Sequence, residues 1–308
     1  MPRRLTCFPS FRQSPIISLF ERRQMINKHD IYIPGISLVL LLLWGCTEKI
    51  DLKLDSSYTR LVVEGSISTD TLSHEVRLTT TSSYFYNETA PAVTGATVTI
   101  SDGDSTWPLN ETIPGLYKTA PDVFGLPNHT YKLSVLLQEP VNGNSAYEAS
   151  CLLRPIVPAD SIRLKFHPDW GKKGFYEVQC YVLDPPTTDF YMFDIYRNTT
   201  LITDTIDKKT VVDDQLYNGN YTNGIGVGFL NQERADQRLI AGDIVTLKVA
   251  GITADYFKFI QAVQTEVGGQ NPLFSGPPAN IPGNVSNGAV GFFAAYANTR
   301  ASAVVRKK

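Results

Sequence analysis

The sequence contains few of the residues on which metal and redox chemistry depend. Its 308 residues include 4 Cys and 4 His, and no two cysteines have the Cys-x-x-Cys spacing of a metal or redox site. His74, His129 and His167 are isolated from one another. No His-Glu-x-x-His, Gly-x-Ser-x-Gly or Walker motif occurs. We therefore expect no bound metal, no cofactor and no enzymatic activity.

Long hydrophobic runs and blocks of one charge are also missing. No stretch reaches the roughly 20 apolar residues of a membrane-spanning helix, which excludes a polytopic transporter. Residues 46–308 carry 22 basic and 28 acidic side chains, a net charge of −6. Beyond the terminal Arg306-Lys307-Lys308 there is no basic cluster, so nucleic acid is not expected as a partner.

The most specific feature that is present lies near the N-terminus. An apolar segment that begins at Ile31 ends in Leu43-Trp44-Gly45-Cys46 and is followed at once by polar residues. This ending resembles the bacterial lipobox, in which the cysteine is acylated and becomes the new N-terminus. We expect residues 1–45 to be a signal peptide, of which 1–24 precede Met25 and are interpreted as a misassigned start.

The rest of the chain alternates apolar and polar residues in short runs separated by turn residues, which is typical of β-sandwiches. After a lipidated tether at 46–57, we predict two tandem sandwiches of the immunoglobulin or transthyretin-like kind, at 58–156 and 157–308. A single helix is predicted at about 253–267, where apolar residues recur at helical spacing. We further predict a hairpin over 215–229 and a final pair of strands after residue 288.

The aromatic and apolar residues of two loops are candidates for a binding surface. Tyr217 and Tyr221 flank a polar Asn-Gly-Asn turn, and exposed tyrosines suit polar recognition. Phe274 and Ile281 lie in the Pro- and Gly-rich segment 271–288, which has no hydrophobic period. The alternative is structural: the tyrosines would pack at a sandwich rim, and the loop would cover the helix and an open sandwich end.

Two cysteines remain after Cys46 and the leader are set aside. Cys151 and Cys180 lie in alternating apolar segments of an exported protein. A disulfide bond between them would close a loop of about thirty residues and stabilise the fold by about 3 kcal/mol. Alternatively, each is a small free core residue. The sequence leaves both interpretations open.

Several motifs resemble the lipoprotein family called domain of unknown function 4249, which is typical of Bacteroidetes-type bacteria. These motifs are the anchor sequence around Cys46, Leu61-Val62-Val63-Glu64-Gly65, the Pro-rich segment 271–284 and Gly288-Ala289-Val290-Gly291-Phe292-Phe293. The resemblance spans essentially the whole mature chain. It implies an outer-membrane lipoprotein, often encoded beside TonB-dependent receptors, that faces the periplasm or the cell surface. It implies no particular activity.

Two functions from different classes follow from these expectations. The first is a lipid-anchored accessory protein that partners a TonB-dependent transporter in nutrient uptake; the second is an adhesive or structural module of the cell surface. Three residues, Thr71, Ser161 and Thr205, fit an Asp-Ser/Thr-apolar pattern that resembles the O-glycosylation sequon of such bacteria. Surface glycans are compatible with either function.

The anchor gives the first testable prediction. Cys46→Ser removes the thiol that would accept the diacylglyceryl group, so the variant should lose its acyl label and its retention in outer-membrane fractions. Metabolic labelling with an alkyne fatty acid measures this directly. Equal labelling of the variant and the wild type would show that Cys46 is not the lipidation site.

Overall fold

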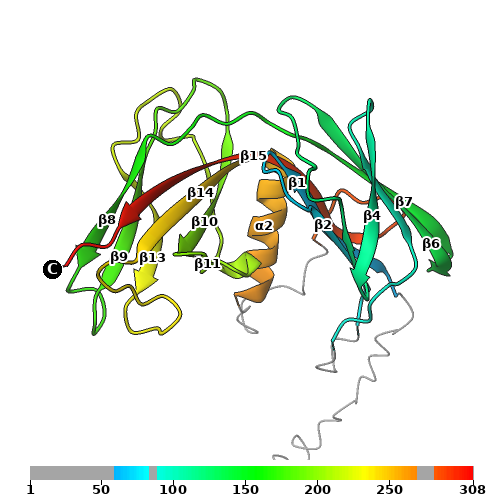
Figure 1. The fold of residues 1–308 in the computed structure, drawn as a ribbon, viewed down its shortest axis with the longest axis horizontal. Helices are drawn as coiled ribbons and strands as arrows, with labels where there is room; N and C mark the ends of the chain where they lie inside the picture. Colours follow the sequence, from blue (N-terminus) through cyan, green and yellow to red (C-terminus); the bar gives the residue numbers. More distant parts are fainter. Residues whose placement is uncertain (1–58, 83–88, 269–280, 308) are drawn as a thin grey trace, which may run out of the picture. The chain divides into compact units, whose positions relative to one another are not determined.

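The computed structural model describes residues 59–82, 89–268 and 281–307. Over these residues the chain is mostly β with one α-helix, and its strands form two sheets in a sandwich-like arrangement (Figure 1). The predicted fold class is therefore confirmed. Among the described helices, none has the length and apolar character needed to cross a membrane. The predicted boundaries between domains stay a prediction.

The first half of the chain forms strands close to those predicted from alternation. They are β1 (Leu61–Ser68), β2 (Glu75–Thr80), β3 (Thr97–Ser101), β4 (Thr106–Ile113), β5 (Leu116–Lys118), β6 (Thr130–Val141) and β7 (Asn144–Leu152). Side chains along β6 and β7 alternate between exposed and buried. Asn142 and Gly143 join these two strands in a tight turn, and both have positive φ angles.

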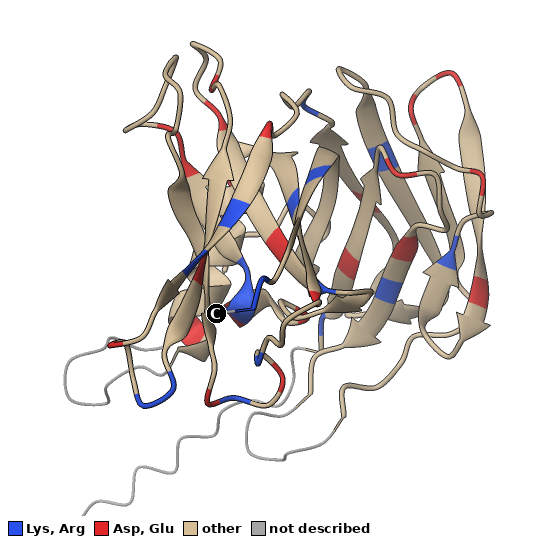
Figure 2. Ribbon diagram, turned by 60° about the vertical axis from the view of Figure 1, so that its left-hand side comes forward, with Lys and Arg blue, Asp and Glu red and all other residues tan. Residues whose placement is uncertain are grey.

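The second half adds further strands and both short helical elements. They are β8 (Ser161–His167), β9 (Phe175–Tyr181), β10 (Phe190–Arg197), β11 (Thr200–Leu201), the 3-10 turn η1 (Ile206–Lys208), β12 (Thr210–Asp213), β13 (Ile225–Asn231), β14 (Ile244–Ile252), α2 (Ala254–Val267) and β15 (Val290–Val304). Strand β12 was not predicted; it pairs with the start of β10. Acidic and basic residues are spread over both halves (Figure 2).

The larger sheet has the order β11-β10-β14-β15-β1-β2-β5-β4-β3-β6-β7, and the smaller sheet has the order β13-β9-β8. Strand β4 pairs with β5 on one side and with β3 on the other. The first core packs side chains of β1, β2 and β15 against those of β3, β6 and β7. The second core lies between β10, β14 and β15 and the smaller sheet. Each half therefore has its own apolar core.

Strand β15 belongs to both halves (Figure 1). Residues 290–296 pair with β1 in parallel, and residues 297–304 pair with β14 in antiparallel orientation. The predicted final pair of strands is wrong: this segment is a single strand of 15 residues. The physical reason is that the segment contains no turn at the point where its partner changes. One continuous strand therefore pairs first with β1 and then with β14.

Helix α2 matches the predicted helix closely. The side chain of Thr253 accepts a hydrogen bond from the backbone N–H of Tyr256 and so caps the first turn of α2. Phe257 and Ile260 are buried, and they belong to a third apolar cluster with residues of β10 and β14. The helix thus covers one face of the larger sheet, which buries its apolar stripe.

The predicted hairpin over 215–229 is wrong in its first arm. The carbonyl of Asp214 accepts hydrogen bonds from the N–H groups of Tyr217 and Asn218, so this segment is a compact turn. Only the glycine-rich second arm is a strand, β13, and it pairs with β9. The hydrogen bonds to the Asp214 carbonyl therefore form a turn where the first arm of the hairpin was predicted. β13 pairs instead with β9, which lies far away in the sequence.

The described residues of the predicted 271–288 loop cover the edge of the first sandwich. The side chain of Asn284 exchanges two hydrogen bonds with the backbone of Phe293 and donates a third to a carbonyl of β7. Ser286 and Asn287 bond further backbone groups of β7. Because β7 ends the larger sheet, these contacts satisfy groups that an open edge would leave unpaired.

Two glycines allow the backbone to pack closely at the start of β15. A Cβ atom on Gly291 would overlap the carbonyl oxygen of Val63, and one on Gly283 would overlap the carbonyl oxygen of Gly291. Gly291 also has a φ angle of +100°, which L side chains rarely adopt. Only glycine fits at Gly291, because both the space and the conformation exclude a side chain.

Gly291→Ala should therefore lower the free energy of unfolding by more than about 3 kcal/mol, since it adds a backbone clash to conformational strain. Gly103→Ala is a matched control: Gly103 has a φ angle of +97°, but no atom lies within 4 Å of the position that the added methyl group would occupy. The control should lose only about 1 to 2 kcal/mol. Urea unfolding followed by fluorescence measures both, and equal losses would contradict the steric explanation.

An ionic cluster joins the turn after β1 to strands β14 and β15. Arg300 donates two hydrogen bonds to Asp70, at 2.8 Å from Nη1 to Oδ1 and 2.6 Å from Nη2 to Oδ2. The Lys248 ammonium lies 3.6 Å from the same carboxylate. The hydrogen bonds from Arg300, with the charge of Lys248, hold the pKa of Asp70 below its ordinary value of 3.8. The charged form of Asp70 therefore stabilises the fold.

This lowered pKa predicts how stability depends on pH. The contribution of Asp70 should be complete above about pH 5 and should disappear as the pH falls below about 4, because the unfolded state then binds a proton that the folded state excludes. Asp70→Asn should cost about 1 to 2 kcal/mol at pH 7, since Arg300 is partly exposed, and should flatten this acid dependence. Thermal melting from pH 3 to pH 7 measures the effect.

The control for this experiment is Asp122→Asn, at an exposed loop position of the same half. It should keep the acid dependence of the wild type. If Asp70→Asn and the wild type lose stability in parallel between pH 5 and pH 3, the ion pair does not contribute as proposed.

Candidate functional site

The candidate binding residues do not form one surface. Tyr217 lines a small cavity, whereas Tyr221 is exposed and makes an isolated β-bridge with Leu183. Ile281 lines a separate groove. Phe274 and Cys46, the predicted lipidation residue, lie outside the described residues. The two predicted loops are therefore distinct places in the fold.

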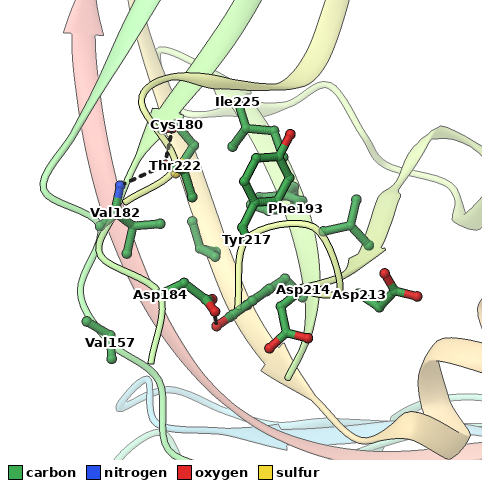
Figure 3. Close-up of a pocket in the computed structure, with 14 residues that line it drawn as sticks. Val157, Cys180, Val182, Asp184, Phe193, Asp213, Asp214, Tyr217, Thr222 and Ile225 are labelled. Atoms are coloured by element: carbon green, nitrogen blue, oxygen red, sulfur yellow. Dashed lines mark hydrogen bonds between the residues drawn. The ribbon is translucent and has the colours of Figure 1, made fainter. Parts of the chain in front are cut away.

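The cavity beside Tyr217 lies inside the second half, and its volume is only about 40 Å³ (Figure 3). Thr222 closes one side by donating to the carbonyl of Cys180 and accepting from the N–H of Val182. A cavity of this volume has room for a water molecule or two. Drug-sized ligands occupy cavities of roughly 300 to 1,000 Å³. We therefore interpret the cavity as a packing feature around the turn that carries Tyr217.

Buried acidic groups border this cavity. The Tyr191 hydroxyl donates to Asp184 Oδ1 at 2.7 Å, and burial raises the pKa of both side chains. Asp214 Oδ2 accepts from the N–H of Asp189, while Asp214 Oδ1 is buried with no hydrogen-bond partner among the described residues. In the described ranges, no group of three or more His, Cys, Asp or Glu side chains could hold a metal ion. The acids instead fix the loops around β10.

The cysteines do not form the disulfide bond considered from sequence. Cys151 and Cys180 are free and buried. Cys151 belongs to the first core and Cys180 to the second, so the two residues pack in different places. Burial raises the pKa of both thiols, that of Cys180 to about 11. Both therefore stay protonated at neutral pH and act as small core residues.

The candidate O-glycosylation residues are accessible. Thr71, Ser161 and Thr205 are all exposed. Thr71 lies in the turn between β1 and β2, Ser161 begins β8, and Thr205 precedes η1. Thr205 also lines the groove that contains Ile281, so a glycan there would enter it. Exposure makes modification sterically feasible; the modification itself stays a prediction.

A larger hollow, a groove of about 760 Å³, lies between α2 and the first strands of the larger sheet. Its walls come from β1, β2, the η1 segment, α2 and the start of β15. Ile281, a candidate binding residue, and Thr205, a candidate glycosylation residue, both line it. The volume lies in the range of ligand sites, and the open form suits a chain segment as well as a small molecule.

One side of the groove is aromatic. The rings of Tyr256 and Phe259 on α2 both pack against Phe292 of β15, with centroids 4.9 and 5.2 Å from that of Phe292. Val263 continues the apolar surface along the helix. These side chains present a broad apolar area whose shape is fixed by mutual packing.

Charged side chains line the groove beside these rings, and Glu64 of β1 is the register neighbour of Phe292. Glu64 of β1 and Arg77 of β2 lie directly across from each other in the sheet, and both line the groove. Glu75 is held by an ion pair with Lys118 at 2.5 Å. Lys209, from the loop after η1, is paired with the buried Asp194. The groove therefore joins apolar contacts with charges of both signs.

Sequence reasoning did not find this groove. Its walls combine residues near positions 62–77, 204–209, 256–263 and 281–292, which only the fold brings together. Two signals were present in the sequence. Phe259 and Val263 were assigned to the apolar face of the predicted helix. The charged residues of β1 and β2 are typical of any exposed strand face.

Comparison with curated proteins gives no match. A protein-family model, described as a domain of unknown function (DUF4249), matches residues 47–302. The match covers the first core, most of the second core, α2, the groove and the glycine-rich start of β15. It thus includes every motif on which the resemblance was based except Cys46 and the residues before it. The chain belongs to the DUF4249 family.

Proposed function

We propose that this protein is a lipid-anchored accessory protein of the outer membrane that docks on a TonB-dependent transporter and assists nutrient uptake. The observation that carries the proposal is the groove between α2 and β1. In this proposal the groove receives a polypeptide segment of the transporter. The family match supports the resemblance from which the location and the partner were inferred.

The position of the groove along the chain supports docking near a membrane. Leu61, the first residue of β1, comes 15 positions after Cys46 (61 minus 46). Even fully extended, a segment of this length spans at most about 50 Å. Val62 and Glu64 of β1 line the groove. If Cys46 carries the lipid, the groove wall is formed by the first described strand that follows the anchor.

The chemistry of the groove supports a protein partner. Protein interfaces combine a few buried aromatic or aliphatic contacts with a polar surround. Tyr256, Phe259 and Phe292 supply the apolar contacts, and Glu64 and Arg77 supply polar groups on the strands next to Phe292. An adhesive or structural module would not require such a groove, so the groove favours the accessory function.

Charged substitutions inside the groove test this proposal. Val263→Asp and Ile281→Asp place a carboxylate on its apolar side, so each should reduce co-purification with a TonB-dependent transporter at least ~10-fold. The measurement is affinity purification of the full lipidated chain from detergent-solubilised outer membranes, with transporters quantified by mass spectrometry.

Val267→Asp is the matched control, because Val267 lies on the same helix, is 59% exposed and does not line the groove. This variant should co-purify with the transporter to the same extent as the wild type. Thermal melting of all three variants shows whether the fold is intact. Absence of any transporter from the wild-type complex, or its unchanged recovery with well-folded groove variants, would contradict the proposal.

A further inference from the structure

The outward face of the smaller sheet carries an unusual mixture of side chains. Its inward face contributes residues such as Val178 and Cys180 to the second core. On the outward face, the register places aromatic, charged and amide side chains next to each other. One row across the sheet is Lys165, Glu177 and Phe229, and the next is Arg163, Gln179 and Gly226.

Trp170 extends this face beyond the strands. It lies in the turn between β8 and β9 and stacks on His167 of β8, with ring centroids 3.9 Å apart and planes 12° from parallel. Its ring centroid is 5.8 Å from that of Phe229. Trp170 is 44% exposed and Phe229 is 50% exposed. Two large aromatic surfaces are therefore adjacent and open to solvent.

A carboxylate is held in a fixed position beside these rings. Glu177 Oε2 lies 2.8 Å from His167 Nε2 and accepts a hydrogen bond from Gln179 Nε2 at 3.2 Å. The Lys165 ammonium is 4.0 Å away. The neighbouring Gly226 leaves space for the group, because a Cβ atom there would lie 2.5 Å from Glu177 Oε1. The face is thus preorganised rather than a set of mobile surface side chains.

We propose that this face binds a polysaccharide chain. The C–H faces of sugar rings stack on exposed aromatic rings, and their hydroxyls bond to carboxylate, amide and ammonium groups; Trp170, Phe229, Glu177, Gln179 and Lys165 present both sets side by side. An open sheet face suits an extended chain, whereas an enclosed small molecule requires a concave site. The cores of protein interfaces are depleted in charged residues, so Lys165 and Glu177 on the strands beside the rings disfavour a protein partner.

This site is independent of the proposed transporter docking. None of its residues lines the groove between α2 and β1. Polysaccharide binding needs neither the lipid anchor nor a protein partner. The failure of either proposal would therefore leave the other unaffected.

Affinity electrophoresis of the full chain in detergent tests the proposal. The probes are neutral polysaccharides embedded in the gel: a β-1,3-glucan, a xylan, a galactomannan and amylopectin, with polygalacturonate as an anionic probe. At least one neutral polysaccharide should retard the wild type. Trp170→Ala and Phe229→Ala should each raise the dissociation constant ~10-fold or more, while Trp170→Phe, which keeps a stacking ring, should lose less.

Phe124→Ala is the matched control, since Phe124 is 46% exposed and lies in a loop of the first half. It should bind like the wild type. Melting temperatures separate lost binding from lost folding, and Phe229→Ala provides a second variant if Trp170→Ala is unstable. Retardation by no neutral polysaccharide, equal retardation of both alanine variants and the wild type, or binding to polygalacturonate alone would each overturn the proposal.

Discussion

The fold depends on one strand that completes two apolar cores. Side chains alternate along β15, so Phe293, Ala295 and Ala297 enter the first core, and Ala301 and Ala303 pack against the second from the same side of the strand. The opposite side carries Phe292 toward the groove and Arg300 toward Asp70. A shift of one residue in register would exchange these two sets in both halves at once.

The ionic cluster around Asp70 also connects the first half of the chain to the second. It attaches the turn after β1 to β14 and to the part of β15 that pairs with β14. The same β1 strand forms a wall of the groove, and the facing wall is α2, which packs on β10 and β14. Contacts that hold β1 and the second half together therefore also hold the two walls of the groove in place.

The sequence predicted the features that depend on neighbouring residues and did not predict those that depend on tertiary contacts. Alternation and turn residues predicted most strands, and apolar residues at helical spacing predicted α2, because these signals lie within one element. The single strand β15 and the partner of β13 depend on residues far away in the chain. The groove was missed for that reason. The Trp170 surface had one local signal, a tryptophan within a glycine-rich turn.

The parallel pairing of β1 with β15 has a consequence for the order of events during folding. Val62 pairs with Val290, so the first described strand of the fold waits for a partner that is synthesised 228 residues later (290 minus 62). The edge of β7 likewise stays uncovered until Asn284 and its neighbours arrive. The first sandwich cannot finish folding until the whole chain has been synthesised. Such non-local strand pairing also makes folding slow. Until synthesis is complete, β1 and β7 need protection from pairing with other chains.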